Sequence, residues 1–564
     1  MNNARFSIGK WTVDPDLGRI FDKEGQEVRL EPKTMEVLVY LANRAGEAVT
    51  RRELEDKVWA GTVVSYEALS VTVNKLRKAL QDTSRKSQYI ETLSKRGYRM
   101  IAPVTRNTTI GETTSGNAGG SRERVFSDTY STVRRPAIVL VVVLLALLGY
   151  AVFRLSGESS SGLPSHVGKA DIAIAVLPFT NISGHPDQDY IANGITEDVI
   201  TDLSRLSRLL VISRSSVLGY AGTSASAETV GRELGVRYVL TGGVRKSGEH
   251  IRITAQLTDV TSNVQVWAER FDRTAGELIA VQDEITRKIV AALVIRLSDE
   301  EQVALRRRYT ENLAAHDFYM RGRALYGSIT KEGNNLARMM FERAIELDPQ
   351  FARAYGALAL THVDDYRRKW GADPAASSER AVEIARKALA LDKEEAVGHW
   401  VLGYVYLYGK KQPEAAIKSA EQALILHPSF ADAYALLGSA SSFLGRSDDA
   451  IRLTRYAMRL NPRSSVVYYA NLGRDYYFKG EFGEAIKNLK EAIGGNYNYL
   501  NAHLYLAATL AHIGAMDDAR WEIDNIRTLD PSFSLSYWAA TQPYASAERL
   551  NQLVADLRKA GAPE

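Results

Sequence analysis

The chain has 564 residues, which suggests about three or four domains of ordinary size. Its 45% of hydrophobic and 24% of charged residues indicate that most of it folds into packed cores. It contains no cysteine, which excludes disulfides, thiolate metal sites and cysteine nucleophiles, and its net charge of +4 is too small to indicate a nucleic-acid partner. Such a partner has to be recognised by a local patch of charge.

Residues 1–106 have the pattern of an α+β domain. Alternating apolar residues between positions 6 and 30 predict short strands. Pro32 suits the first turn of a helix, and Gly46 is a suitable stop for it. The segment Thr50–Glu53 has the spacing of a capping box, so a second helix is expected to begin there.

A third helix, expected at about 67–80, combines an apolar stripe with polar faces. The stripe has helical spacing and consists of Leu69, Val73, Leu76 and Leu80. The other faces carry residue types that bind phosphates and base edges, namely Ser70, Thr72, Asn74, Lys75, Arg77 and Lys78. A hairpin follows at 90–101, with Lys95 and Arg96 at its tip. Residues 66–106 hold nine Lys/Arg against three Asp/Glu, which indicates a DNA-binding surface.

The stretch WAGTVVSYEALSVTVNKLRKAL followed by YIETLSKRGYRM resembles the OmpR/PhoB-type winged helix-turn-helix. The resemblance covers about the first 105 residues, and it implies that the third helix enters the major groove while the hairpin contacts the minor groove. It places the six polar residues of that helix in or beside the major groove, and Lys95 and Arg96 on the wing. The loop Trp59 to Val64 lies where relatives contact RNA polymerase. Glu67 stands where relatives often have a basic residue, so no phosphate contact is expected there. The alternative is a protein-binding winged helix with a solvated basic face.

A hydrophobic segment divides the chain. Residues 107–133 are rich in Gly, Ser and Thr and predict a flexible linker. Residues 136–155 are predicted to form one transmembrane helix, because 137–153 are 17 residues without charge. Arginines are more numerous before this span than after it, which places the N-terminus in the cytoplasm and the C-terminal part in the periplasm of a bacterial inner membrane. The alternatives are a buried core helix and a wholly cytoplasmic chain.

Residues 170–300 predict an α/β module. Helical patterns separate the strand patterns at 172–179, 209–213 and 238–244. Two further strands are expected at 250–259 and 265–272, and a helix at about 277–297 closes the segment. The β-α-β-α order favours a parallel or mixed sheet with covering helices. The stretches AVLPF, YIANGITEDVITDLSRL and LLVISRSSV resemble the TolB N-terminal-like modules, which implies a unit for interaction or sensing.

Residues 310–545 contain an internal repeat. Small residues recur in pairs seven positions apart, at Ala337/Ala344, Ala381/Ala388, Ala416/Ala423, Ala450/Ala457 and Ala485/Ala492, and Ala519 with Ile526 opens a sixth unit. From Ala381 onward the steps are 35, 34, 35 and 34 residues, which is the tetratricopeptide pattern of an all-α solenoid. The first step is 44 residues, and we place the additional residues in a loop near 365–378. Such repeats imply a concave surface for a protein or peptide partner.

No pattern for a zinc site, a cofactor or a catalytic constellation is present, so we expect no enzyme and no cofactor. The order of winged helix, span and exported region resembles the ToxR/CadC-like one-component regulators. It implies a membrane-anchored regulator of promoter DNA, with a homodimer as a plausible switch. Two alternatives stay open: an envelope scaffold acting through its repeats, and a cyclase-like enzyme sharing the C-terminal modules.

Overall fold

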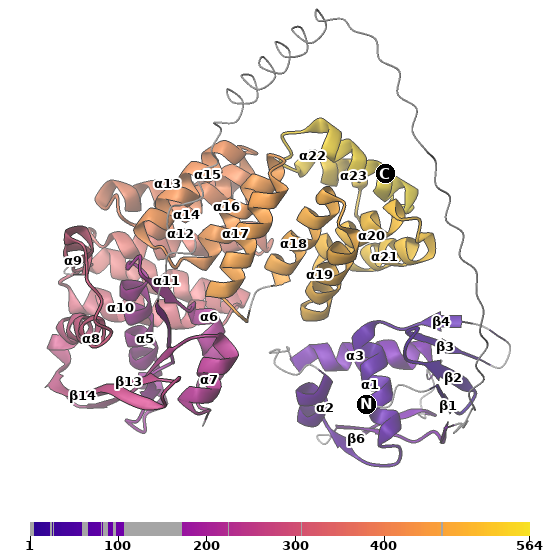
Figure 1. The fold of residues 1–564 in the computed structure, drawn as a ribbon, viewed down its shortest axis with the longest axis horizontal. Coiled ribbons are helices and arrows are strands. Elements are labelled where there is room, and N and C mark those ends of the chain that lie inside the picture. The colour runs from indigo at the N-terminus through magenta and orange to yellow at the C-terminus, as the bar shows by residue number, and fades with distance from the viewer. Residues whose placement is uncertain are drawn as a thin grey trace, which may run out of the picture. The chain divides into compact units, whose positions relative to one another are not determined.

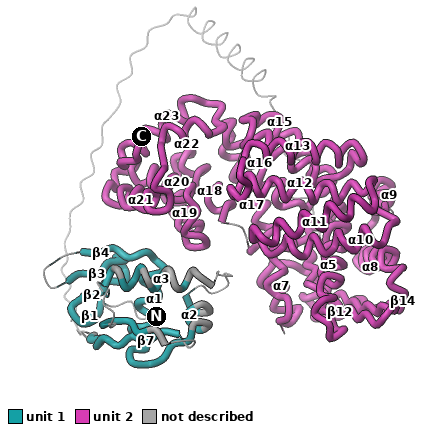
Figure 2. The backbone as a smooth tube through the Cα atoms, turned by 180° about the vertical axis from the view of Figure 1, so that it is seen from behind, with its two compact units in different colours: residues 1–160 teal, residues 161–564 magenta. Residues whose placement is uncertain are grey.

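The structure is a computed structural model. It describes the chain except residues 1–4, 23–24, 26, 59–65, 81, 83–87, 94–96, 107–171, 224, 306 and 464–465. The chain divides into two compact units, Met1–Ser160 and Ser161–Glu564, shown in two colours in Figure 2. The predicted linker 107–133 and span 136–155 lie outside the described residues. Within the described part of the chain, no helix combines the length and the apolar character needed to cross a membrane.

Unit 1 begins with an antiparallel sheet of five short strands, in the order β4-β3-β2-β1-β8. The strands are β1 (Phe6–Ile8), β2 (Trp11–Asp14), β3 (Arg19–Phe21), β4 (Glu27–Arg29) and β8 (Val104–Arg106). The alternation seen in the sequence buries Phe6, Ile8, Trp11, Val13 and Ile20. Strand β8 returns the end of the domain to its first strand, with Phe6 opposite Arg106.

Three helices and a second sheet complete the described part of unit 1 (Figure 1). They are α1 (Pro32–Asn43), α2 (Arg51–Val58), α3 (Tyr66–Ala79), and the strands β5 (Val49–Thr50), β6 (Ile90–Leu93) and β7 (Gly97–Met100) in the order β5-β7-β6. Pro32 occupies the first turn of α1 as expected. The Thr50 hydroxyl accepts the N–H of Glu53 at 3.2 Å, which caps α2. The Glu53 carboxylate accepts from the Tyr40 hydroxyl at 2.8 Å, which ties α2 to α1.

Unit 2 begins with a mixed sheet in the order β11-β9-β12-β13-β14, as the α/β pattern predicts. Its strands are β9 (Ile172–Val176), β10 (Thr180–Asn181), β11 (Leu209–Val211), β12 (Tyr238–Ser247), β13 (His250–Asp259) and β14 (Val264–Thr274). β9 runs parallel to β11 and β12, whereas β13 and β14 continue antiparallel. The helices of this region are α5 (Asp189–Leu203), α6 (Arg214–Val217), α7 (Ala227–Leu234), α8 (Leu278–Ala292) and α9 (Asp299–Leu305).

Helical hairpins follow the sheet region in unit 2. They are α10 (Leu313–Tyr326), α11 (Lys331–Leu347), α12 (Ala352–Arg367), α13 (Pro374–Leu391), α14 (Ala396–Tyr404), α15 (Pro413–Leu426), α16 (Ala431–Phe443), α17 (Ser447–Leu460), α18 (Val466–Lys479), α19 (Phe482–Gly495), α20 (Leu500–His512) and α21 (Met516–Leu529). All paired alanines of the repeat are buried at the crossings of these helices. A side chain at Gly473 would lie 2.3 Å from Leu489 Cγ, and Gly480 has φ +80°, so both positions require glycine.

The ten additional residues of the first step are mostly helical, which corrects the loop expected near 365–378. Helix α12 has 16 residues against 13 in α16, and α13 has four more residues before Ala381 than α17 has before Ala450. Only the connection at 368–373 is a loop. Asp373 caps α13 through the N–H groups of Ala375 and Ala376 at 2.9 and 3.1 Å, so α13 starts early.

The sheet of unit 2 and the repeats share one hydrophobic core, which runs from Ile174 to Tyr468. The edge strand β11 is covered by the loop after α15. There the Ser429 hydroxyl accepts the N–H of Val211 at 3.1 Å and donates to the carbonyl of Leu209 at 2.9 Å. At the C-terminal end of α17, the Leu460 carbonyl accepts the N–H of Ser213 at 2.8 Å. The loops that end the repeats therefore also hold the sheet.

The chain ends in α22 (Leu535–Thr541) and α23 (Ala547–Lys559). Helix α23 packs against α20 and reaches the ends of three repeat helices. Arg549 donates to the Gly445 carbonyl at 2.9 Å, the Tyr477 hydroxyl donates to Asp556 at 2.7 Å, and Lys559 donates to the Ala511 carbonyl at 2.8 Å. These contacts fold the C-terminus back over the repeats.

Candidate nucleic-acid interface

Helix α3 is held in unit 1 by its apolar stripe. Leu69, Val73, Leu76 and Leu80 are all buried, as their spacing predicts. The last carbonyl of the stripe is also satisfied, because Trp11 Nε1 donates to the Leu80 carbonyl at 3.1 Å. The helix therefore has one fixed rotation about its axis, with its stripe turned inward.

The wing strand β6 is joined to the end of α3 through both backbone groups of Ile90. Arg77 Nη2 donates to the Ile90 carbonyl at 2.8 Å, and the Ile90 N–H donates to Asp82 Oδ2 at 3.0 Å. Asp82 also accepts the N–H groups of Gln88 and Tyr89 at 2.7 and 3.1 Å. This network sets the position of the wing relative to α3.

The Asp82 carboxylate is buried, yet it stays ionised. Burial acts to raise the pKa of Asp82, but the N–H groups of Gln88, Ile90 and Tyr89, with the nearby charge of Arg77, hold it below the ordinary value of 3.8. Asp82 was not predicted as a functional residue from the sequence. One feature of the sequence could have indicated it: Asp82 is an acidic residue directly after a basic helix, and DNA binding alone gives no reason for an acidic residue there.

The second wing strand is held by a close approach that needs glycine. Gly97 has φ +137°, and a Cβ atom there would lie 2.1 Å from the Val49 carbonyl oxygen. Strand β7 pairs with β6 on one side and with β5 on the other, with Val49 opposite Tyr98. The wing is therefore attached to the domain at both of its strands.

The structure brings all six predicted helix residues onto α3 but gives them different surroundings. Arg77 is engaged with the wing backbone, as described above. Lys75 Nζ lies 2.8 Å from Glu31 Oε1 at the start of α1, and Thr72 is half-buried. Two of the predicted DNA contacts thus also have partners inside the domain.

Ser70, Asn74 and Lys78 follow one another at four-residue steps along α3. At about 100° per residue, Asn74 and Lys78 fall on the side of the helix away from the buried stripe. These positions are the ones a helix presents to a groove when its stripe faces the core. The side chains of these three residues lie outside what the structure describes, as do Lys95, Arg96 and the whole loop Trp59–Val64.

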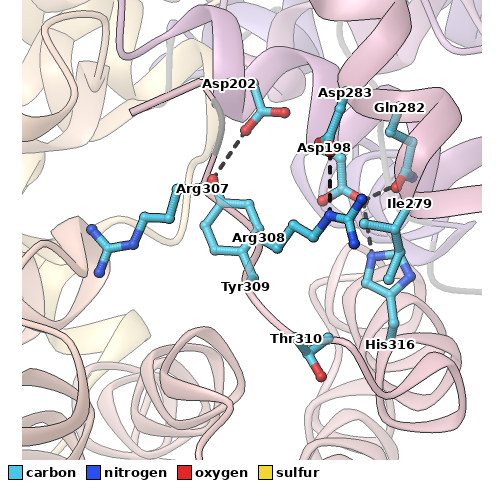
Figure 3. A pocket seen from close by; sticks show the side chains of 10 residues that line it. All are labelled: Asp198, Asp202, Ile279, Gln282, Asp283, Arg307, Arg308, Tyr309, Thr310 and His316. Carbon is cyan, nitrogen blue, oxygen red and sulfur yellow. Dashed lines mark hydrogen bonds and ion pairs between the residues drawn. The ribbon is translucent and has the colours of Figure 1, made fainter. Parts of the chain in front are cut away.

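Unit 2 contains a second candidate site, a pocket where α5, α8 and α10 meet the segment before α10 (Figure 3). Asp198 lies in its wall and is fully paired. Its carboxylate binds Arg353 Nη1 at 2.7 Å and Gln282 Nε2 at 2.9 Å, and His316 Nε2 lies 3.2 Å away. Burial acts to raise the pKa of Asp198, but Arg353 and His316 outweigh it and lower the pKa.

The other two acids of the pocket also have partners. The Tyr309 hydroxyl donates to Asp202 at 3.0 Å, and Arg308 Nε lies 3.9 Å from Asp283. Burial raises the pKa of Asp202 to about 6, against the lowering effect of Arg205 and other nearby cations. Because these polar groups bind each other, we interpret the pocket as the junction between the sheet and the first repeat. The described residues contain no cluster of three or more His, Asp or Glu that could hold a metal ion.

Three segments of the chain match known protein families. Residues 25–100 match the C-terminal domain of transcriptional regulatory proteins, residues 170–288 match the second domain of HilA/YgeH-like transcriptional regulators, and residues 471–526 match the tetratricopeptide repeat. Unit 1 therefore carries a winged helix of the transcriptional-regulator type, and unit 2 carries tetratricopeptide repeats. The segment that we expected to resemble TolB matches the HilA-like domain instead.

Curated relatives match only part of this chain. It is 40% identical to putative adenylate cyclase 3 of Rhizobium meliloti over 243 residues, which is 43% of this chain and 41% of that protein. It is 37% identical to the transcriptional activator CadC of Escherichia coli over 98 residues, 17% of this chain and 19% of CadC. It is 38% identical to the cholera toxin transcriptional activator of Vibrio cholerae over 99 residues, 17% of this chain and 34% of that protein. The matches span less than half of each relative. They show homology to the CadC- and ToxR-type activators.

Proposed function

We propose that this protein is a membrane-anchored, one-component transcription regulator. It binds promoter DNA through α3 and the wing, and it receives its signal or partner through unit 2. The observation that supports this proposal most is the network of Arg77, Asp82 and Ile90, because it holds a basic helix and a basic hairpin in one arrangement. The homology to transcriptional activators agrees with it.

The proposal places residues 136–155 in a bacterial inner membrane, with unit 1 in the cytoplasm and unit 2 in the periplasm. The 17 uncharged residues at 137–153 and the arginines before them support this topology. Reporter fusions after Leu155 test it. Activity of a periplasmic reporter is expected, and activity of a cytoplasmic reporter alone would overturn the topology while leaving DNA binding in place.

The proposal assigns the chain no catalytic activity. Two of the three family matches are to transcription regulators, and the third is to the tetratricopeptide repeat. The relative named putative adenylate cyclase 3 is matched over less than half its length. Contact of the loop Trp59–Val64 with RNA polymerase, and pairing of two copies on adjacent half-sites, are further parts of the proposal.

Genome-wide DNA occupancy of the intact protein tests the central claim. The informative variant is Lys78→Ala, with Lys57→Ala as its control, because Lys57 is an exposed lysine of α2 and the change in charge is the same. We expect discrete peaks that weaken in Lys78→Ala and persist in Lys57→Ala. In a binding assay, loss of one phosphate contact should also lower the salt slope by about one. Absence of enriched sites in the wild type would favour the envelope scaffold instead.

A further inference from the structure

The segment between α22 and α23 lies against the repeats through Tyr544. Its ring centroid is 4.9 Å from that of Phe443 and 5.4 Å from that of Phe478, both edge to face. Its hydroxyl is 2.8 Å from the hydroxyl of Tyr505. We call Phe443, Phe478 and Tyr505 the aromatic cluster; they come from α16, α18 and α20. Edge-to-face rings with one shared hydroxyl contact favour a phenol at this position.

The backbone of the segment is held as a bound peptide would be. The Ala545 N–H donates to the Phe443 carbonyl at 3.1 Å. Just before the segment, in the last turn of α22, the Ala540 carbonyl accepts from Lys411 Nζ. Gln542 is extended, with φ −75° and ψ 139°. One anchoring side chain plus main-chain hydrogen bonds is a common way to bind an extended peptide.

The segment leaves some binding capacity of this surface unused. Thr541 and Ala545 are exposed, and Tyr544 is only half-buried. Arg474 is 3% exposed and lies 4.7 Å from the centre of the Phe443 ring, the same ring that Tyr544 contacts. Within the described part of the chain, Arg474 Nη2 and Asp475 Oδ2 have no hydrogen-bond partner although both are buried.

Tyr544 also contacts both hydrophobic cores of unit 2. One core contains the sheet and the first repeats, and the other contains the last repeats and α23. Removal of its side chain from the aromatic cluster would therefore change the packing of both cores. Displacement of Tyr544 by another occupant of the aromatic cluster would therefore affect both parts of unit 2.

We propose that the aromatic cluster is the site where the repeats bind a partner protein, through an extended segment that presents a tyrosine. Residues 541–546 are the internal occupant that the partner has to displace. This inference deepens the proposed function, since it names the partner site of unit 2, and it rests on that function for its regulatory meaning. The internal segment itself shows which chemistry the surface accepts.

A labelled peptide with the sequence AATQPYASA, which copies residues 539–547, tests the site on the full-length chain by fluorescence anisotropy. Tyr544→Ala vacates the cluster, so this variant should bind the peptide at least about tenfold more tightly than the wild type does. A peptide with alanine in place of tyrosine should lose binding, and so should the double variant Tyr544→Ala/Phe443→Ala. Equal binding of both peptides, or no binding by Tyr544→Ala, would overturn the inference.

Two further variants guard against a trivial result. Ala545→Pro removes the N–H that binds the Phe443 carbonyl but keeps the tyrosine, and it should also increase peptide binding. Tyr537→Ala removes a tyrosine of α22 that is 75% exposed, and it should bind like the wild type. If Tyr544→Ala melts much earlier than the wild type, Ala545→Pro alone decides. The DNA affinity of the wild type is measured in parallel. If the wild type does not bind DNA, the proposed function is contradicted. If it binds DNA but Tyr544→Ala does not bind the peptide, only this inference is contradicted.

Discussion

The contact that positions the wing in unit 1 and the contacts that join the sheet to the repeats in unit 2 span very different distances along the sequence. In unit 1, the contact that positions the wing joins Arg77 to Ile90, which are 13 residues apart. In unit 2, the contact that joins the sheet to the repeats pairs Asp198 with Arg353, 155 residues apart, and Val211 with Ser429, 218 apart. The first kind of contact joins two segments that follow one another in the sequence. The second kind of contact depends on how the sheet and the repeats pack against each other. Single substitutions should show how much each kind of contact contributes to stability.

The largest loss of unfolding free energy is expected from Arg353→Ala. It leaves the buried Asp198 without its guanidinium partner, and breaking a buried ion pair from one side costs ~3–5 kcal/mol of unfolding free energy. Arg343→Ala is the control, because its pair with Glu346 is exposed and should contribute little. Denaturant unfolding of both variants measures the difference. Equal losses would show that the distant contact does not hold the junction.

Asp82→Asn should come next, with a loss of ~1–3 kcal/mol for unit 1, since a charged acceptor of three N–H groups is weakened. The effect depends on pH with a definite sign. Because the pKa of Asp82 is lowered in the folded protein, its contribution is complete well above the ordinary value of 3.8 and is lost as the pH falls through the folded pKa. The difference in unfolding free energy between Asp82→Asn and the wild type should therefore be large at neutral pH and should disappear in strong acid. A difference that stays constant down to strong acid would contradict the role of Asp82 as an ionised acceptor.

Ser429→Ala should cost ~1–2 kcal/mol, because the Val211 N–H and the Leu209 carbonyl at the edge of the sheet lose their partner. Ser262→Ala, in the exposed turn between β13 and β14, is the matched control. Hydrogen exchange of β11 gives a local readout of the same change. Unaltered protection of β11 in Ser429→Ala would mean that the repeat loop does not cover the strand.

Lys75→Ala should have the smallest effect on stability, less than ~1 kcal/mol, since its ion pair with Glu31 is partly exposed. Its effect on DNA affinity separates two roles. If Lys75 contacts a phosphate, the affinity and the salt slope fall together. If the lysine serves only to pair with Glu31, both stay at the wild-type level, and the prediction of a DNA contact at this position is wrong.

Most secondary structure was predictable because it follows local periodicity. The third helix was expected at about 67–80 and spans Tyr66–Ala79, and the alanine pairs of the repeats are buried where the period places them. The excess of ten residues in the first step was predicted as a loop near 365–378. A cap at Asp373 starts α13 four residues early, and α12 is longer than α16 by three residues, so most of the excess is helical.

The candidate interface was predictable as a set of positions and not as a set of contacts. The stripe Leu69–Leu80 determines which positions of α3 face away from the core, and this follows from the sequence. That Arg77 binds the wing backbone, and that Lys75 pairs with Glu31, depends on where two other segments lie. A basic residue on a helix has the same appearance in sequence whether its partner is a phosphate or a carbonyl.

The sequence by itself determined the order of the elements, the period of the repeats and the basic character of α3 and its wing, because each of these is encoded within a few helical turns. Only the tertiary structure decided that the loops ending the repeats hold the sheet of unit 2, and that the C-terminal segment lies on the aromatic cluster. These contacts are made by ordinary serines, arginines and tyrosines far apart in the chain. Their partners are set by the packing of the domains, which no local pattern records.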